Sequence, residues 1–391
     1  MQTYINRSAK SLTLQYMQLF PVVAILGPRQ CGKSTLAREL GKDIDNFLFI
    51  DLEDPSDRLR INDLSLFFNL NKNATVCIDE AQLMPNLFPE LRSIVDKDRR
   101  NGQILLLGSA SRELVNKSAE SLAGRIGYIE LSPFFYPEIA DDKEETIIQH
   151  WIRGGFPLSF LAENDRYSEI WRKQYIQSYL ERDLVLSGNS IPLLTIQRLM
   201  QMLANNHGQL LNSSQMGGSL GINYHTTRNY IDFFEKSFIT RTLQPFAPKL
   251  NKRISKSPKV YIRDSGILHS LLDISNINQL LGNAVYGYSW EGYVIENLIN
   301  SAPEWQPWFY RTATGNEIDL LLTKGNKMLA FECKATLSPV LSRGTFTAME
   351  DLKINELFVV SLVSKSYYAK PNIQVGNLND ALQYIGNKQF A

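Results

Sequence analysis

The residues best suited to chemistry form a short loop near the N-terminus. The segment GPRQCGKS at 27–34 has the spacing G-x-x-x-x-G-K-S. Its glycines let consecutive backbone N–H groups face a phosphate chain, Lys33 can reach the β- and γ-phosphates, and Ser34 can offer a hydroxyl to Mg²⁺. The predicted ATP-binding residues are Gly27, Pro28, Arg29, Gln30, Cys31, Gly32, Lys33, Ser34 and Thr35.

A pair of carboxylates supplies the second half of the predicted site. Asp79 and Glu80 follow the apolar run 74–78, which reads as a buried strand. An acid at the end of such a strand can hold Mg²⁺, and a neighbouring acid can orient and deprotonate the attacking water. We therefore expect Asp79 and Ser34 at the metal and Glu80 as the base, with a solvated acid pair as the alternative.

The elements that must position these residues are short buried strands. The apolar runs 22–26, 47–50 and 103–107 each precede a loop or a polar tip, and the residues after Lys33 have helical periodicity. Strands that alternate with helices predict an α/β fold with a parallel sheet. The run 103–107 leads to Ser109, whose hydroxyl would lie beside the acid pair.

Several motifs occur in the order typical of one family. The segments GPRQCGKST, DLEDP, CIDEAQLMP, GSAS, LAGR and LSPFFYPEI resemble the prokaryotic AAA+-like P-loop ATPases over about the first 150 residues. The resemblance implies that Ser109 senses the γ-phosphate, although a helix-capping serine would look the same. It also implies an arginine that stabilises charge on the nucleotide of its own chain or a neighbour's. Arg125 is the first candidate, Arg112 and Arg153 compete with it, and a surface ion pair is the alternative for each.

The middle of the chain changes character. Residues 141–194 are expected to form a helical lid or connector, and 195–265 resemble a winged helix with helices at 195–205, from 213, and at 224–234. His225, Thr226 and Arg228 would then read DNA bases. Packing between domains is the alternative role. The basic residues that would contact phosphates are Lys249, Lys252, Arg253, Lys256, Lys259 and Arg263.

Acidic residues and a lysine recur near the C-terminus with a second characteristic spacing. Glu332 and Lys334 lie two apart on a predicted strand, so they share a face, and Asp319 starts the strand before it. With Glu291 on a preceding helix, the order resembles the PD-(D/E)xK, restriction-endonuclease-like fold. That resemblance implies Mg²⁺ at Asp319 and Glu332, with Lys334 as catalyst and Glu291 in support. Relatives with this fold can also keep such residues for binding or stability alone.

Length and composition set the remaining limits. The 391 residues carry 41 basic and 40 acidic side chains, so any DNA contact must come from a local patch. Three cysteines without metal-ligand spacing argue against a disulfide framework or a zinc site. With no signal segment or membrane span in sight, we expect a cytoplasmic protein.

We divide the chain into an ATPase core (1–140), a lid or connector (141–194), a winged-helix-like part (195–265) and a nuclease-like α/β domain (266–391). The expected partners are ATP and DNA, with a homo-oligomer or a protein partner as further options. The rival to an ATP-coupled nuclease is a nucleotide-dependent switch with an inactive nuclease-like domain.

Overall fold

The chain divides into two compact units, residues 1–134 with 236–238, and residues 135–235 with 239–391. The structure is a computed structural model that describes residues 4–84, 86–109, 118, 120–140, 144–186, 192–247 and 254–389. Within those ranges, the helices are all too short or too polar to cross a membrane.

Unit 1 is built on a parallel five-stranded sheet in the order β2-β3-β4-β1-β5. Its strands are β1 Val22–Leu26, β2 Phe47–Asp51, β3 Thr75–Asp79, β4 Ile104–Gly108 and β5 Ile126–Glu130. Strand β4 lies between β1 and β3, so the carboxyl ends of all three meet at one edge of the sheet. That edge carries the predicted phosphate loop, the acid pair and Ser109.

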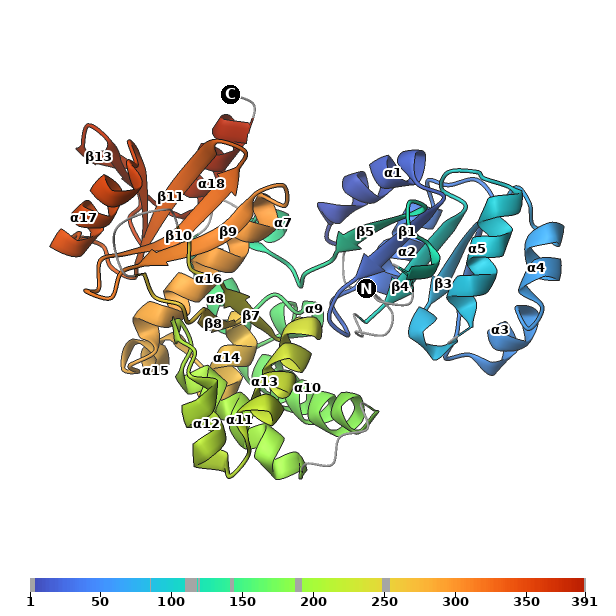
Figure 1. Cartoon of the computed structure of the whole chain (residues 1–391), viewed down its shortest axis with the longest axis horizontal. Coiled ribbons are helices and arrows are strands. Elements are labelled where there is room, and N and C mark those ends of the chain that lie inside the picture. Colours follow the sequence, from blue (N-terminus) through green and yellow to red (C-terminus); the bar gives the residue numbers. More distant parts are fainter. Residues whose placement is uncertain are drawn as a thin grey trace. The chain divides into compact units, whose positions relative to one another are not determined.

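Alternation along the strands explains why helices cover both faces of this sheet (Figure 1). Val23 and Ile25 pack with α1 and α2, while Val22 and Ala24 pack with α4 and α5. The helical elements of this unit are α1 Ala9–Leu19, α2 Lys33–Gly41, α3 Pro55–Arg60, α4 Leu64–Leu70, the 3₁₀ turn η1 Ala81–Leu83 and α5 Leu87–Lys97.

Unit 2 begins with helices and a small sheet. The first helices are α7 Tyr136–Ile139, α8 Glu144–Arg153, α9 Pro157–Phe160 and α10 Asp165–Leu186. The next elements are α11 Leu193–Asn205, β6 Gln209–Leu210, α12 Ser213–Leu220, α13 Tyr224–Lys236, β7 Thr240–Leu243 and β8 Lys259–Ile262. Strand β8 is the centre of an antiparallel sheet in the order β6-β8-β7.

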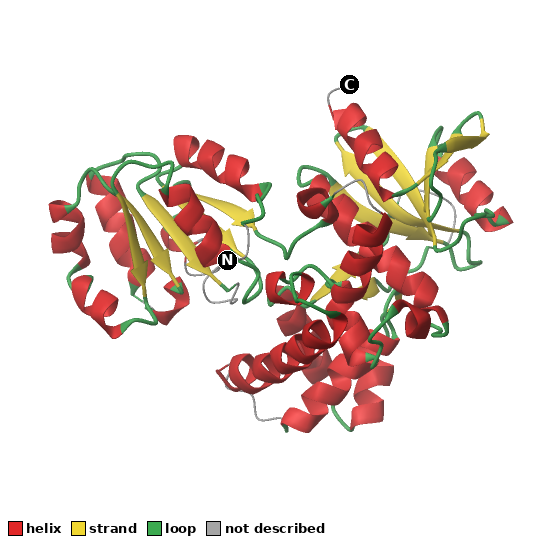
Figure 2. Ribbon diagram, turned by 180° about the vertical axis from the view of Figure 1, so that it is seen from behind, coloured by secondary structure: helices red, strands yellow, loops and turns green. Residues whose placement is uncertain are grey.

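The second half of unit 2 is a mixed six-stranded sheet between helices (Figure 2). Its order is β13-β14-β12-β11-β10-β9, antiparallel from β9 to β11 and parallel from β11 through β12 to β14. The strands are β9 Gln306–Arg311, β10 Glu317–Lys324, β11 Lys327–Lys334, β12 Leu357–Ser361, β13 Tyr367–Lys370 and β14 Ile373–Gly376. The helices are α14 Ser265–Leu271, α15 Ile277–Leu281, α16 Tyr286–Ser301, α17 Arg343–Leu352 and α18 Leu378–Gln389.

The two faces of the mixed sheet have separate cores. Leu320, Leu322 and Phe331 pack with α16 and α18, and Leu321 and Val359 pack with α17. The pairing of β9 with β10 shifts register between Ile318 and Leu321. Such an irregularity re-aims a side chain, and here it falls at Asp319.

Candidate functional site

The predicted phosphate loop connects β1 to α2 in a conformation that depends on glycine. Gly32 has φ +101°, in the left-handed region, and Gln30 has φ +60°. A Cβ atom on Gly27 would lie 2.2 Å from the backbone oxygen of Leu131. The two glycines of the motif are therefore needed for two reasons, a left-handed turn and a close backbone approach.

Lys33 begins α2, and its ammonium folds back into the loop. Its Nζ donates to the carbonyl oxygens of Gly27 at 3.1 Å and Pro28 at 2.8 Å. The side chain is almost fully buried, and both acceptors are neutral. Phosphate oxygens would offer the ammonium stronger, charge-assisted hydrogen bonds than these carbonyls.

Ser34 and Asp79 meet beside the loop. The Ser34 hydroxyl donates to Asp79 Oδ2 at 2.5 Å, and Asp79 Oδ1 accepts the Glu80 N–H at 2.9 Å. Among the described residues, no lysine or arginine nitrogen lies within ion-pair distance of the Asp79 carboxylate. Hydroxyl and carboxylate oxygens are the ligands that Mg²⁺ prefers, so these two side chains fit the metal that usually accompanies the nucleotide.

Glu80 takes a backbone conformation that is uncommon for its type. It has φ +53°, in the left-handed region, where it ends β3 and starts η1. Burial raises the pKa of its carboxyl, while a hydrogen bond from Gln82 and the charge of Lys33 act in the opposite direction. A carboxyl with a raised pKa at this edge is a stronger proton acceptor than an ordinary glutamate.

Ser109 directly follows β4, so it lies at the same sheet edge as the phosphate loop. Arg125 does not. It immediately precedes β5, at the amino ends of the strands, where its backbone oxygen accepts the Val22 N–H. Its guanidinium pairs with both oxygens of Asp96, at 2.6 and 3.1 Å. The prediction that Arg125 serves the nucleotide of its own chain is therefore wrong, and the surface ion pair is what the structure shows.

The other two arginines give no support for that role. Arg112 lies outside the described residues. Arg153 belongs to unit 2, where it is buried and its guanidinium contacts Asp165 at 2.7 Å and the backbone oxygen of Ala162 at 2.7 Å. Those contacts account for its charge and its donors locally.

Arg7 supports the phosphate loop, and the sequence analysis did not predict this role. Arg7 is 4% exposed, and its guanidinium donates to the backbone oxygens of Cys31 at 2.9 Å and Ser132 at 2.5 Å. It also lies over the ring of Phe134. A single basic residue far from any motif carries no signal in the sequence, so only the fold reveals that it braces the phosphate loop.

The predicted C-terminal residues also converge. Asp319 Oδ2 accepts the N–H of Cys333 at 2.9 Å, which places it at the strand that carries Glu332 and Lys334. Lys334 Nζ donates to Glu332 Oε1 at 2.8 Å, so the two share a face as predicted. Glu291 on α16 reaches the same region, because both it and Asp319 contact Lys259.

Lys259 was wrongly placed in the exposed basic stretch. It is 3% exposed, and its Nζ lies 2.8 Å from Glu291, 2.7 Å from Glu317 and 3.7 Å from Asp319. Arg263 is also largely buried, and it pairs with Glu296 at 3.1 Å. The missed signal is the strand pattern around Lys259, because it opens a short apolar strand that is buried along its whole length.

Burial and neighbouring charges shift the pKa values of the groups in this cluster. Burial raises the pKa of Glu291 to about 7, and burial and the charge of Asp319 raise that of Glu332 to about 8. Burial alone would lower the pKa of Lys259, but the surrounding carboxylates raise it well above its ordinary value. Within the described ranges, no group of three or more His, Cys, Asp or Glu side chains is placed to hold a metal ion. Asp319 instead lies 3.7 Å from the Lys259 ammonium, and Glu332 accepts a hydrogen bond from Lys334. The Mg²⁺ site at these two residues stays a prediction.

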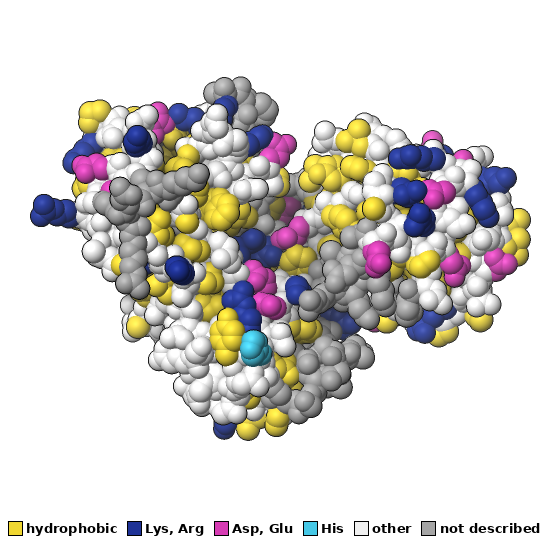
Figure 3. All heavy atoms as spheres, in the orientation of Figure 1, with side chains coloured by type: hydrophobic (Ala, Val, Ile, Leu, Met, Phe, Trp, Pro, Cys, Tyr) yellow, Lys and Arg dark blue, Asp and Glu magenta, His cyan; other side chains and the backbone are white. Residues whose placement is uncertain are grey.

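The side chains predicted to contact DNA differ in their exposure and in their ion pairs. His225 and Lys256 are exposed, and Thr226 is half-buried. Arg228 pairs with Asp232 one turn along α13, at 3.2 Å. Lys252 and Arg253, like Lys249, lie outside the described residues. On the face seen in Figure 3, basic and acidic side chains are interspersed and form no large patch of one sign.

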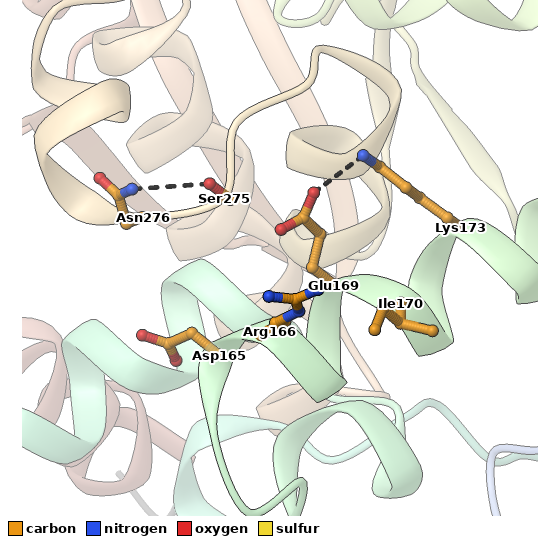
Figure 4. Close-up of a pocket in the computed structure, with 7 residues that line it drawn as sticks. All are labelled: Asp165, Arg166, Glu169, Ile170, Lys173, Ser275 and Asn276. Atoms are coloured by element: carbon orange, nitrogen blue, oxygen red, sulfur yellow. Dashed lines mark hydrogen bonds and ion pairs between the residues drawn. The ribbon is translucent and has the colours of Figure 1, made fainter.

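A pocket in unit 2 has polar walls but no converging groups (Figure 4). Glu169 and Lys173 in it pair at 2.8 Å, and Asp165 pairs with Arg153. Its lining residues are Asp165, Arg166, Glu169, Ile170, Lys173, Ser275 and Asn276. Because its charged groups largely neutralise one another, the pocket gives no indication of a ligand.

Comparison with known families divides the chain into three matches. Residues 19–140 match the family described as an AAA domain. Residues 144–278 and 286–380 match two domains of unknown function, DUF8612 and DUF4143.

Two curated relatives are similar over most of the chain. They are the uncharacterized proteins Rv2008c of Mycobacterium tuberculosis and Mb2031c of Mycobacterium bovis. Each is 38% identical over 355 residues, which cover 91% of this chain and 79% of the relative.

Similar solved structures include the Walker-type ATPase paby2304 of Pyrococcus abyssi and the RuvB Holliday junction branch migration motor of Thermotoga maritima. The first is 16% identical with a TM-score of 0.48, covering 69% of this chain and 96% of that one. The second is 17% identical with a TM-score of 0.26, covering 60% and 87%. Likenesses this remote carry no argument. The two relatives, by contrast, are 38% identical over most of both chains, so this chain belongs to the family of Rv2008c and Mb2031c. The family match gives it an AAA-like P-loop ATPase domain at residues 19–140.

Proposed function

We propose that unit 1 binds ATP with Mg²⁺ and hydrolyses it. The observation that carries this proposal is the contact of Ser34 with Asp79, beside a lysine that only neutral carbonyls hold in place. An anion with a divalent cation would complete both halves of this arrangement, because Lys33 donates to neutral carbonyl oxygens and Asp79 accepts from a neutral hydroxyl and a backbone N–H.

Each side chain then has a separate task. The amides of residues 27–35 bind the phosphates, and Lys33 moves from the loop carbonyls to the β- and γ-phosphates. Ser34 and Asp79 hold the metal, which supplies positive charge to the phosphate oxygens as negative charge builds up on them. Glu80 orients a water and accepts its proton, and Ser109 contacts the γ-phosphate.

ATP binding and turnover by wild type, Lys33→Ala and Glu80→Gln test this proposal. We expect Lys33→Ala to lose binding and Glu80→Gln to bind ATP but hydrolyse it much more slowly. Turnover at the wild-type rate in both variants would contradict the assignment.

For unit 2 we propose the architecture that the sequence resembles, within the four-part division given above. The order α11, β6, α12, α13, β7, β8, with the three strands in one sheet, supports a winged-helix-like part. The order α16, β9, β10, β11, α17, β12, with Glu291, Asp319 and Glu332 brought together, supports a nuclease-like fold.

We propose that this nuclease-like domain does not cleave nucleic acid, and that ATP binding and hydrolysis switch the protein between states that a partner recognises. The reason is that the Asp319 and Glu332 oxygens are largely engaged by the chain itself.

Nuclease activity, with Lys334 as catalyst, is the second candidate. It is tested by incubating single- and double-stranded DNA and RNA with Mg²⁺ or Mn²⁺, with and without ATP, and comparing wild type with Lys334→Ala. Cleavage that the variant loses would overturn the switch.

DNA is the partner class that the winged-helix-like part favours. Exposed His225 and Lys256 are available to a duplex, whereas Arg228 would first have to leave Asp232. A His225→Ala, Lys256→Ala variant should lower affinity for duplex DNA, and the binding should weaken steeply as salt rises. Equal, salt-insensitive affinity in both proteins would leave a protein partner or a second copy of the chain.

A further inference from the structure

We propose that the ammonium of Lys259 takes the place of a metal ion among the carboxylates of Glu291, Glu317 and Asp319 in unit 2. Oxygens that could bind a divalent metal instead bind this ammonium and so attach β8 to the six-stranded sheet. The proposal concerns unit 2 alone and does not depend on ATP hydrolysis. It names a site whose residues come from two sheets and a helix.

The first step is where Lys259 comes from. Its backbone belongs to the small sheet, paired with Leu210 on one side and Leu243 on the other. Its side chain leaves that sheet and ends among acids from α16 and β10. The side chain of this lysine thus joins the small sheet to the six-stranded sheet.

The second step is the chemistry around the ammonium. Three carboxylates lie within 3.7 Å of one Nζ, and the side chain is 97% hidden from solvent, being 3% exposed. Tyr261, two residues along the same strand face, donates its hydroxyl to Glu291 Oε1 at 2.6 Å. A buried ammonium is tolerated only when it is paired and hydrogen-bonded, and this one meets both conditions.

The third step is the backbone beside it. Phe246 N–H donates to the Phe309 oxygen at 2.6 Å, and Ser255 N–H to the Arg311 oxygen at 2.9 Å. The chain that leaves β7 and the chain that enters β8 therefore both bond to β9. Lys259 lies four residues after Ser255, so its side chain and these backbone hydrogen bonds hold the same two sheets together.

The fourth step is the consequence for metals. Magnesium at a nuclease-like site would need Asp319 and Glu332, with Glu291 nearby. Asp319 faces Lys259, and Glu332 Oε1 accepts from Lys334. Glu332 Oε2 is buried without a hydrogen-bond partner in the described part of the chain, but the Lys334 ammonium bound to the same carboxylate opposes a second cation there. Removing the Lys259 ammonium should therefore create a divalent site that the wild type lacks.

The test counts Mn²⁺ bound without nucleotide, from the electron paramagnetic resonance signal of free Mn²⁺. Asp79→Asn serves as the background, because it removes the metal ligand of unit 1. In that background we expect no Asp319-dependent binding up to about 1 mM Mn²⁺, and one bound ion after Lys259→Met, lost again when Asp319→Asn is added. Lys256→Met is the matched control, an exposed lysine three residues away, and should bind no Mn²⁺.

Stability gives an independent readout. Lys259→Met should lower the melting temperature of unit 2 by about 10 °C, as expected for breaking a buried pair, and Mn²⁺ should restore part of the loss. If Lys259→Met does not fold, Lys259→Met with Glu291→Gln removes one opposing charge and takes its place. Asp319-dependent Mn²⁺ binding with Lys259 intact would overturn the proposal. So would a folded Lys259→Met protein that gains no Mn²⁺ site.

Discussion

The phosphate-loop site and the Lys259 cluster use the same groups in opposite ways. In unit 1, Lys33 is held by two neutral carbonyls and Asp79 by a hydroxyl and a backbone N–H, so cation and anion stay apart. In unit 2, Lys259 lies against the carboxylates of Glu291 and Glu317. A site that keeps its charges unpaired is ready for a charged ligand, whereas a site that pairs them internally is destabilised when one partner is removed.

The comparison predicts that the two sites fail in different assays. Lys33→Ala should reduce ATP hydrolysis by about 10³-fold or more, because the loop loses the ammonium that is expected to contact the β- and γ-phosphates. Asp319→Asn should leave ATP binding and hydrolysis unchanged. Isothermal titration with ATP and a phosphate-release assay check both variants. A loss of ATP binding in Asp319→Asn would break the separation on which the comparison rests.

Lys259→Met should cost unit 2 about 3 kcal/mol of unfolding free energy, because it leaves buried carboxylates without their cation. Lys334→Met should cost less, since that side chain is 31% exposed and water compensates the loss. Denaturant unfolding followed by tryptophan fluorescence measures both, because all five tryptophans belong to unit 2. Equal losses would mean that burial of the lysine does not distinguish the two pairs.

Glu80→Gln should retain ATP binding and slow hydrolysis by about 10²-fold, the effect of losing a positioned base. The amide keeps the size and the hydrogen-bonding reach of the side chain, so only proton transfer is removed. Single-turnover hydrolysis checks this. An unchanged rate would show that another group deprotonates the water.

The two units should also differ in how their stability depends on pH, since all four histidines lie in unit 2. Burial lowers the pKa of His269 to about 3 from 6.5, and its ring contacts the Ile152 oxygen and the Ser289 hydroxyl. The stability that its neutral ring contributes is therefore present above pH 6.5 and is lost as the pH falls toward 3. At pH 5 the loss should reach about 2 kcal/mol.

His269→Gln removes that titration. The stability difference between wild type and variant, measured by urea unfolding, should therefore shrink between pH 7.5 and pH 5. A difference that stays constant over this range would mean that His269 is not buried in its neutral form.

Arg125→Ala should have the smallest effect. Its ion pair with Asp96 is partly exposed, so we expect little or no loss of stability and an unchanged rate of ATP hydrolysis. A large fall in hydrolysis would restore a role for this arginine at a neighbouring chain's nucleotide.

Sequence patterns predicted the parts of the molecule that are local. The strand before Gly27, the acid pair after β3 and the Glu332–Lys334 spacing each depend on a few consecutive residues. Arg7 and Lys259 could not be placed in the same way, because their partners lie far along the chain and contact them only after folding. Lys259 did leave a trace, since it opens the apolar strand 259–262, but the basic residues before it suggested a solvated stretch.

The measurement that tests the account most directly is the number of Mn²⁺ ions bound per chain with a non-hydrolysable ATP analogue. We predict one ion, lost in Asp79→Asn and unaffected by Asp319→Asn. Two ions, with the second removed by Asp319→Asn, would contradict the claim that unit 1 takes its cation from solution while unit 2 supplies its own.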